Sequence, residues 1–298
     1  MADIRAEAAI DPALIPPLDL ALFTPTDAEL VFLRKAISTD YEEIRRRVIE
    51  VQKEAYTKYP YPCIRAFHHV SLMMTANPIY QTVLNASKLG ETLLLDLGCC
   101  MGTDVRKLVQ DGYPASHILG CDLRQDFIDL GFKLYSDGET CPIHFFTSDI
   151  FNCPVEFEFG RDPSAITPGA RITELAQLTG SLTHIYVGAL FHLFDESTQY
   201  AIALRLASLL KRRSGAVIFG RHRGLEQEGM IDDHLGRIRY GHSERSWPVM
   251  WRKVFGEAEG DEFATSRVLV EAKINDFDHT IFGTRRQGKM LVWHVIIL

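Results

Sequence analysis

The stretch LLDLGCCMGTD, residues 94–104, is the feature that most constrains the fold of this chain. A short apolar run reaches Asp96 and then Gly98, and the helix-like segment 104–112 follows at once. A buried strand that passes through a glycine turn into a helix is the first unit of an open α/β sheet. Ligands of such sheets bind beyond the carboxyl ends of the strands. We therefore expect a ligand site at this turn.

Strands and helices alternate along the rest of the chain after residue 91. We expect a long helix from Asp195 to about 215, a helix near 171–178, and further strands at residues 117–123, 143–150, 183–191 and 216–220. Such alternation favours a parallel sheet covered on both faces. Two closing strands, 267–274 and 290–298, have no helix long enough between them. We expect them to pair antiparallel.

The first 90 residues have a different, helical pattern. Two capping boxes begin at Thr26 and Thr39, and each is followed three residues later by glutamate. The prolines of YPYP, residues 59–62, should end the helix that follows Thr39, because proline removes a donor and restricts the residue before it. A second, mostly helical stretch is expected over 63–88.

Charge and cysteine usage exclude several classes of function. The 298 residues carry a net charge of −7, which argues against a nucleic-acid partner. No apolar run approaches the ~20 residues of a membrane span. The six cysteines show neither the paired spacing of a zinc site nor the density of a secreted scaffold. We expect a cytoplasmic protein with no metal site and no membrane span.

Three ligand templates can be tested on the glycine turn. A phosphate-cradling Walker loop fails, because no lysine follows Gly102. The dinucleotide pattern GxGxxG fails as well, since only Gly98 is present. The pattern DxGxGxG matches at Asp96, Gly98 and Gly102, with Cys100 in place of the middle glycine. A small side chain is expected to be tolerated there if the position keeps a negative φ.

The turn resembles motif I of class I S-adenosylmethionine-dependent methyltransferases. Asp122, at the end of the second strand, can accept hydrogen bonds from both ribose hydroxyls. Asp149 ends the third strand, where the acid of this superfamily contacts the adenine amine. Either acid could instead cap the next turn or helix. We expect the cofactor site to comprise Asp96, Gly98, Cys100, Gly102, Asp122, Leu123, Asp149 and Ile150.

The resemblance implies a Rossmann-like α/β fold. Its sheet is mostly parallel and seven-stranded, with the antiparallel strand pair at the C-terminal end. The expected organisation is a helical lobe over residues 1–90 that covers the substrate site, and an S-adenosylmethionine-binding domain over 91–298.

A more particular resemblance lies in YPYPCIRAFHHVSLMM, residues 59–74. It is similar to a PYPCI-(R/Q)-x-F motif of fungal secondary-metabolite O-methyltransferases that act in meroterpenoid pathways of the austinol, andrastin and terretonin type. The resemblance implies methylation of the carboxylate of a farnesylated, polyketide-derived acid, giving a methyl ester before terpene cyclisation. It also implies a homodimer.

The candidate catalytic residues depend on the acceptor. A carboxylic acid, with a pKa of about 4, is already ionised at neutral pH and needs alignment rather than a base. Arg65 is the candidate carboxylate holder, or else part of an ion pair within the lobe. His192 is a general base for a phenol or hydroxyl acceptor, or else a packing residue before Asp195. Arg221 and Arg223 could hold an anion or be loop charges.

Two alternative functions stay open at this point. One is a phenol or hydroxyl O-methyltransferase that uses His192, and the other is a non-catalytic, methyltransferase-like regulator. At most one of His68 and His69 is expected to line the pocket, because neighbouring residues on a helix point in different directions. Trp247 and Trp251 are expected to pack the sheet edge.

Overall fold

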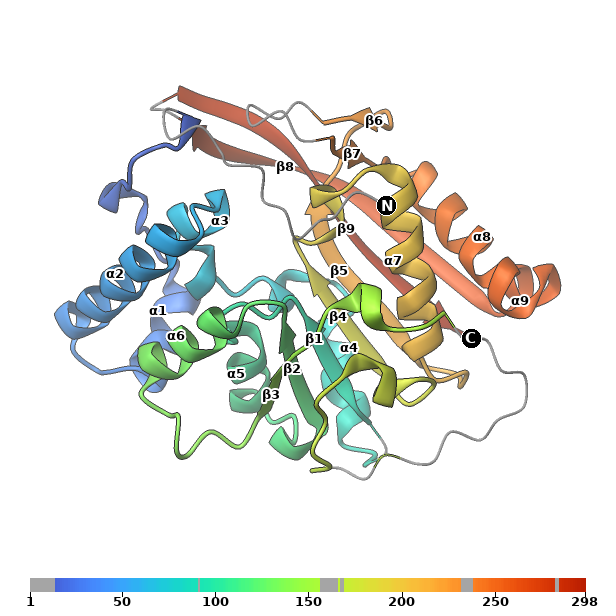
Figure 1. The fold of residues 1–298 in the computed structure, drawn as a ribbon, viewed down its shortest axis with the longest axis horizontal. Helices are drawn as coiled ribbons and strands as arrows, with labels where there is room; N and C mark the ends of the chain where they lie inside the picture. The colour runs from blue at the N-terminus through green and yellow to red at the C-terminus, as the bar shows by residue number, and fades with distance from the viewer. Residues whose placement is uncertain (1–13, 91, 156–165, 167–168, 232–237, 282–283) are drawn as a thin grey trace.

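The computed structural model describes residues 14–90, 92–155, 166, 169–231, 238–281 and 284–298. Its centre is a seven-stranded sheet of order β3-β2-β1-β4-β5-β9-β8 (Figure 1). The strands are β1 (Leu94–Leu97), β2 (Ile118–Asp122), β3 (His144–Thr147), β4 (His184–Gly188), β5 (Val217–Arg223), β8 (Val268–Ile281) and β9 (Thr284–Ile297). Neighbours among β1 to β5 pair in parallel, whereas β9 runs antiparallel to β5 and β8. The expected fold class is confirmed.

Both faces of the sheet are covered by helices, as the all-buried strands β1 and β2 require. Helices α4 (Tyr80–Ser87) and α5 (Thr103–Gln110) share one core with Leu94 and Phe219. Helices α7 (Glu196–Leu209) and α8 (Ser246–Glu259) share the other core with Leu95 and Ile218. Trp247 and Trp251 are fully buried in this second core, so their expected packing role is confirmed. A short helix, α9 (Asp261–Ser266), and a two-stranded ribbon, β6 (Gly229–Met230) with β7 (Tyr240–Gly241), complete the domain.

The N-terminal lobe is helical, with some differences from expectation. Its helices are α1 (Asp27–Ala36), α2 (Tyr41–Lys58) and the short α3 (Pro62–Arg65). The capping box at Thr26 is confirmed, but α2 is capped by Asp40 rather than Thr39. The stretch after the prolines is only partly helical. It contains α3, two 3-10 turns (His68–Val70 and Met74–Ala76) and α4, which packs on the sheet.

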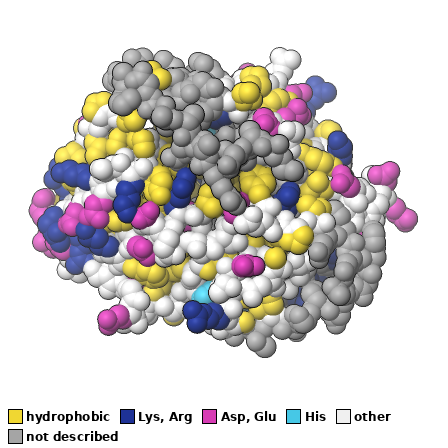
Figure 2. Space-filling view, viewed as in Figure 1, with side chains coloured by type: hydrophobic (Ala, Val, Ile, Leu, Met, Phe, Trp, Pro, Cys, Tyr) yellow, Lys and Arg dark blue, Asp and Glu magenta, His cyan; other side chains and the backbone are white. Residues whose placement is uncertain are grey.

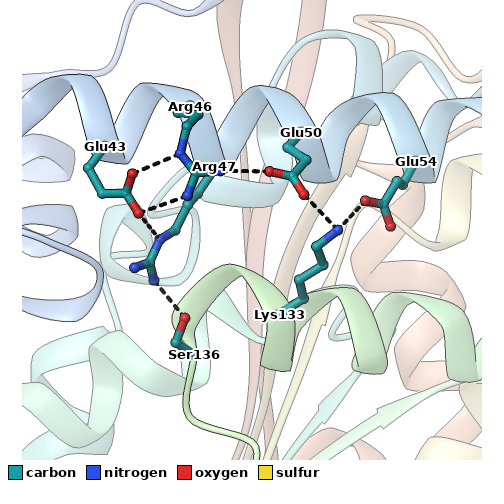
Figure 3. A network of polar contacts seen from close by, with 7 residues as sticks. All are labelled: Glu43, Arg46, Arg47, Glu50, Glu54, Lys133 and Ser136. Carbon is teal, nitrogen blue, oxygen red and sulfur yellow. Dashed lines mark hydrogen bonds and ion pairs between the residues drawn. The ribbon is translucent and has the colours of Figure 1, made fainter.

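The lobe is attached to α6 (Gln125–Tyr135) through an apolar core and a rim of charges. In the rim, Lys133 of α6 forms ion pairs with Glu50 and Glu54 of α2 (Figure 3). Arg47 donates to the hydroxyl of Ser136 at 2.6 Å and also pairs with Glu43. Figure 2 shows the charged side chains gathered at the left of the view, over α2 and α6. Arg46 and Arg47 of α2 are therefore used in intramolecular ion pairs.

Two helices expected from the sequence are shorter in the structure. The expected helix near 171–178 is a 3-10 turn, Leu175–Leu178, and α7 ends at Leu209 instead of near residue 215. The expected N-cap of α7 is confirmed, because the Asp195 carboxylate accepts the N–H of Thr198 at 2.7 Å. Within the described ranges, no helix is both long and apolar enough to cross a bilayer.

Candidate cofactor and acceptor site

The glycine turn between β1 and α5 needs glycine for two different reasons. Gly98 and Gly102 have φ values of 79° and 69°, in the left-handed region that favours glycine. At Gly102, an added Cβ would lie 2.6 Å from the ring of Phe145 and 2.7 Å from a guanidinium nitrogen of Arg106. Gly98 faces solvent. The turn therefore presents open backbone at its start and is tightly packed at its end.

Cys100 does not have the backbone conformation expected for it. Its φ is 52°, so the condition of a negative φ, under which a side chain is expected to be tolerated, is not met, and the residue occupies the position of a left-handed glycine. A side chain in this region costs about 1–2 kcal/mol. The cysteine backbone is held by Asp122, whose Oδ2 accepts the Cys100 N–H at 2.8 Å.

Asp122 and Asp149 lie at strand ends and also cap local turns. The two oxygens of Asp122 accept the N–H groups of Cys100 and Arg124, the second at 2.9 Å. Asp149 accepts the N–H of Phe151 at 2.9 Å and caps a 3-10 turn, Ile150–Asn152. A carboxylate oxygen has two acceptor positions, so these bonds leave room for ligand hydroxyls or amines. Beside Asp122, the apolar Leu123 is 52% exposed.

Asp96, Asp104 and Asp122 bring three carboxyl groups together at the turn, where the charges of Asp104 and Asp122 act on Asp96. Asp96 is 3% exposed, and in the described parts of the chain its carboxylate makes no hydrogen bond. Burial, followed by the charges of Asp104 and Asp122, raises the pKa of Asp96 well above its ordinary value. Burial also raises the pKa of Asp104 to about 7, and that of Asp122. Each shift would be relieved by a bound cation, because an opposite charge favours the ionised form.

Arg221, near the carboxyl end of β5, lies within electrostatic reach of Asp104. The guanidinium is half-buried, and its Nε has no hydrogen-bond partner among the residues that the structure describes. Its charge acts to lower the raised pKa of Asp104. Burial, followed by the charge of Arg221, lowers the pKa of His68 to about 4. His68 and Asp104, which come from distant parts of the chain, thus both lie within electrostatic reach of the Arg221 guanidinium.

His68 and His69 differ as expected. His68 reaches solvent, although protein surrounds it closely enough to lower its pKa. His69 is buried, and its backbone carbonyl accepts a hydrogen bond from the Thr103 hydroxyl. Only His68 can line the pocket. The hydroxyl of Tyr186, on β4, is buried without a hydrogen-bond partner in the described residues, and its pKa is raised by burial, then by Asp104 and Asp96.

Arg65 and His192 lie in different surroundings. Arg65 is 7% exposed and donates from Nε to the carbonyl of Pro17 at 2.8 Å, which ties the preceding segment to the lobe. Its own carbonyl accepts a bond from Gln52 at 2.9 Å. His192 is half-buried on the 3-10 turn Phe191–Leu193 that follows β4. The expected catalytic roles of both residues stay predictions.

Two buried histidines near His192 were not singled out from the sequence. His222 accepts a hydrogen bond from the indole of Trp293 at 2.9 Å, and its pKa is far below the ordinary value, first by burial and then by His192 and His242. Burial also lowers the pKa of His242 to about 4. Both rings pack against Trp247, with centroid distances of 4.5 and 5.1 Å. The two-residue period of β5 is the signal that separates Arg221, on the cavity face, from His222, on the opposite face.

The sheet order and the glycine turn, together with the strand-end acids Asp96, Asp122 and Asp149, define a class I methyltransferase. The donor set fits S-adenosylmethionine, the cofactor of that class, because it offers carboxylates to a cation and to ribose, and an exposed apolar side chain beside them. The structure is also similar to a solved SAM-dependent methyltransferase from Anabaena variabilis, with a TM-score of 0.47, 13% identity, and coverage of 85% of this chain and 94% of that chain.

Sequence comparison gives the family. Residues 21–70 match the model of the meroterpenoid methyltransferase N-terminal domain. The chain is 32% identical to O-methyltransferase atr3 of Stereocaulon alpinum over 83% of this chain and 67% of the relative. It is 30% identical to the asnovolin E/chermesin D methyltransferase nvfJ of Aspergillus novofumigatus, with 74% of each chain covered. The chain belongs to this family of fungal meroterpenoid-type methyltransferases.

Proposed function

We propose that this methyltransferase converts the carboxylate of a farnesylated, polyketide-derived acid to its methyl ester, before terpene cyclisation. The observation that carries the proposal is Arg221, a half-buried guanidinium whose Nε has no hydrogen-bond partner in the described structure, and which lies within electrostatic reach of Asp104. A partly buried guanidinium with an unpartnered nitrogen suits a planar anion, since arginine and carboxylate pair through two parallel hydrogen bonds.

The proposed cofactor contacts follow the strand ends. Asp122 accepts hydrogen bonds from the ribose hydroxyls. Asp149 and Ile150 contact the adenine, and the apolar side chain of Leu123 packs against the cofactor between the ribose and the adenine. Asp96, Gly98, Cys100 and Gly102 surround the amino-acid end, where the negative charge of Asp96 and Asp104 stabilises the cationic groups. The cofactor supplies an electrophilic methyl group.

The acceptor needs alignment and desolvation more than a base. Arg221 holds one face of the acceptor carboxylate, and neutral His68 lies at the cavity wall where it can donate a hydrogen bond. A carboxylate oxygen gives an electron pair to the methyl carbon while the sulfur keeps the electrons of its broken bond. The negative charge of the carboxylate and the positive charge of the sulfonium disappear together. No proton moves, so no general base is required.

Arg65 has a secondary place in this proposal. Its bond to Pro17 supports a positioning role, in which it fixes the segment before α1 above the pocket. We also propose that the lobe, given as residues 1–90, covers the acceptor, and that residues 91–298 bind the cofactor. The proposed assembly is a homodimer, as the family resemblance implies.

The second candidate is methylation of a phenol or hydroxyl with His192 as the base. The observation in its favour is the electrostatic link between His192 and buried His222 beyond β4 and β5. A phenol has a pKa of about 10 and needs such a base. A non-catalytic regulator is less well supported, because Asp96, Asp122 and Asp149 are all present at the strand ends.

The acceptor class can be tested with matched compounds. The protein is incubated with S-adenosylmethionine and prenylated aromatic acids, the methyl esters of the same acids, and related phenols without a carboxyl group. We expect a methylated product from the free acids alone, detected by mass spectrometry. A product from the pre-formed esters or from the phenols would contradict carboxyl methylation and favour the His192 mechanism.

A further inference from the structure

The YPYPC segment, residues 59–63, is pinned to the beginning of α6. Lys58, just before it, forms an ion pair with Asp126 in the first turn of α6. The hydroxyl of Tyr59 donates to the other oxygen of Asp126 at 3.1 Å, and the Tyr59 ring meets the ring of Phe127 edge-on at 5.3 Å. Asp126 and Phe127, in the first turn of α6, therefore fix the position of residues 59–63.

The same segment reaches back toward the end of β2. The guanidinium of Arg124 lies 4.6 Å from the centroid of the Tyr59 ring. Tyr61 stacks on Tyr59 at 5.8 Å and also meets Phe127 at 6.1 Å. Arg124 is two residues after Asp122, and its N–H is held by that carboxylate. The lobe thus covers the chain directly beyond the proposed ribose site.

Cys63, at the end of residues 59–63, lies close to the proposed cofactor site. Its thiol is partly exposed, and it packs on the apolar cluster that also contains Met101 and the partly exposed Cys100. Burial raises the pKa of Cys63 to about 11, and the charge of Asp122 adds to that shift. The pKa of Cys100 is raised by burial, then by Asp122 and Cys63. The two thiols therefore pack against one apolar cluster and lie within electrostatic reach of the Asp122 carboxylate.

An independent observation indicates that a ligand binds beside Asp122. Asp96 is buried, its carboxylate makes no hydrogen bond within the described structure, and it lies within electrostatic reach of Asp122. A buried carboxylate without a partner is costly unless a ligand completes it. A second observation is that the apolar side chain of Leu123, next to Asp122, is 52% exposed.

We propose that residues 59–63 form the wall of the cofactor site that the N-terminal lobe contributes, with Cys63 in contact with the cofactor beside Asp122. The inference rests on the cofactor placement proposed above, and it adds a binding residue from outside the α/β domain. Its consequence is that docking of the lobe on α6 and binding of the cofactor stabilise each other. A neutral thiol suits this place, because it adds no charge next to three carboxyl groups.

Three partly exposed cysteines make a direct test possible. Cys63 and Cys100 line the proposed site, whereas Cys141 lines a surface pocket at the amino ends of the strands, with Leu93 and Ile143. The full chain is treated with N-ethylmaleimide at pH 8, with and without S-adenosylhomocysteine, and the modification of each cysteine is followed by peptide mass spectrometry. Calorimetry on the same sample measures binding of S-adenosylhomocysteine.

At a ligand concentration of 100 times Kd, only about 1% of the sites are free, so labelling of an occluded thiol falls by up to about 100-fold. We expect at least about tenfold protection of Cys63 and Cys100, and none of Cys141. Protection of Cys100 without Cys63 would overturn this inference and leave the cofactor placement intact. If the compound binds but protects neither, or if it does not bind, the proposed cofactor site fails together with the inference.

A pair of variants measures the contact itself. Cys63→Phe should fill the wall and weaken binding of S-adenosylhomocysteine by at least about tenfold, whereas Cys63→Ala should change it less than about threefold. Cys141→Phe is the matched control, and its affinity should equal that of the wild type. Unchanged affinity in a folded Cys63→Phe protein would overturn the contact. Should that variant not fold, the labelling result decides the question alone.

Discussion

The backbone N–H of Cys100 donates a 2.8 Å hydrogen bond to Oδ2 of Asp122, and this bond joins the glycine turn to the end of β2. Cys100 has a left-handed backbone at the point where the motif usually has glycine. The same carboxylate also accepts the N–H of Arg124. Asp122 therefore shapes the turn in addition to its proposed contact with the ribose.

The first prediction concerns the strain at Cys100. Cys100→Gly removes a side chain from a left-handed backbone, which is worth about 1–2 kcal/mol, while the freer unfolded chain costs about 0.4–1 kcal/mol. We expect urea unfolding to give an equal or slightly higher stability, and calorimetry to give equal or tighter cofactor binding. A clear loss of either would show that the cysteine side chain has a positive role in the site.

The second prediction concerns Asp122. Asp122→Ala removes the acceptor for two backbone N–H groups as well as the proposed ribose contact, so cofactor binding should weaken by about 100-fold or more. Asp122→Asn keeps the shape and one acceptor oxygen, and it should lose less. Binding of S-adenosylhomocysteine, measured by calorimetry, gives both values. Unchanged affinity in Asp122→Ala would contradict the placement of the ribose.

The third prediction concerns Arg221. A charged hydrogen bond is worth about 1.5–3 kcal/mol, so Arg221→Gln should raise KM for an acid acceptor by about 10- to 150-fold. The affinity for S-adenosylhomocysteine should change little, since the guanidinium is assigned to the acceptor. Arg252→Gln, on the exposed face of α8, removes the same charge elsewhere and serves as the control. An unaltered acceptor KM in Arg221→Gln would remove the residue from the site.

The fourth prediction concerns pH. Burial raises the pKa of Asp104 to about 7 in the free protein, so this group is mostly protonated at pH 6. A cationic ligand lowers that pKa, and binding of S-adenosylmethionine at pH 6 should therefore release a proton and become tighter as pH rises toward 7. Calorimetry in buffers of different ionisation enthalpy measures the release.

Asp104→Asn is the matched variant for this test, because its amide oxygen can still accept the N–H of Met74. Proton release at pH 6 should be smaller in this variant. Equal release in the two proteins would mean that another group, such as Asp96, gives up the proton, and it would refute the role given to Asp104.

The fifth prediction concerns His192. If the acceptor is a carboxylate, His192→Asn should lower kcat by less than about tenfold, because a general base contributes about 100- to 10,000-fold only where a proton must be removed. The variant is compared with the wild type on the same acid under saturating cofactor. A loss of 100-fold or more would assign His192 as the base and support the phenol or hydroxyl alternative.

The sequence predicts the parts of this fold that depend on local pattern. The strand–turn–helix at 94–112, the antiparallel pair β8–β9 and the cap at Thr26 follow from periodicity and capping residues, and the structure confirms them. The conformation of Cys100 could not be predicted, because it depends on a hydrogen bond to Asp122 from the next strand. Nor could the 3-10 turns after residue 66, where packing against the sheet and α5 overrides helix propensity.

The acceptor side of the site was harder to predict than the cofactor side. The three strand-end acids lie at places that chain order alone identifies. Arg221, His68 and Asp104 come together only because β5, the lobe and α5 meet at one sheet edge. Long-range meetings of this kind leave no local pattern in the sequence. Arg65, which a motif indicates, donates to the carbonyl of Pro17, and its place in the acceptor site stays a prediction.

The most direct test of carboxyl methylation follows the fate of a labelled methyl group. The protein is given S-adenosylmethionine with a labelled methyl and a prenylated aromatic acid that also carries a phenol, and the purified product is treated with mild alkali. We predict that the label is released as methanol, because a methyl ester is hydrolysed under these conditions. Label that stays on the product would show an ether or a carbon-bound methyl group, and would contradict the proposal that Arg221 presents a carboxylate for methylation.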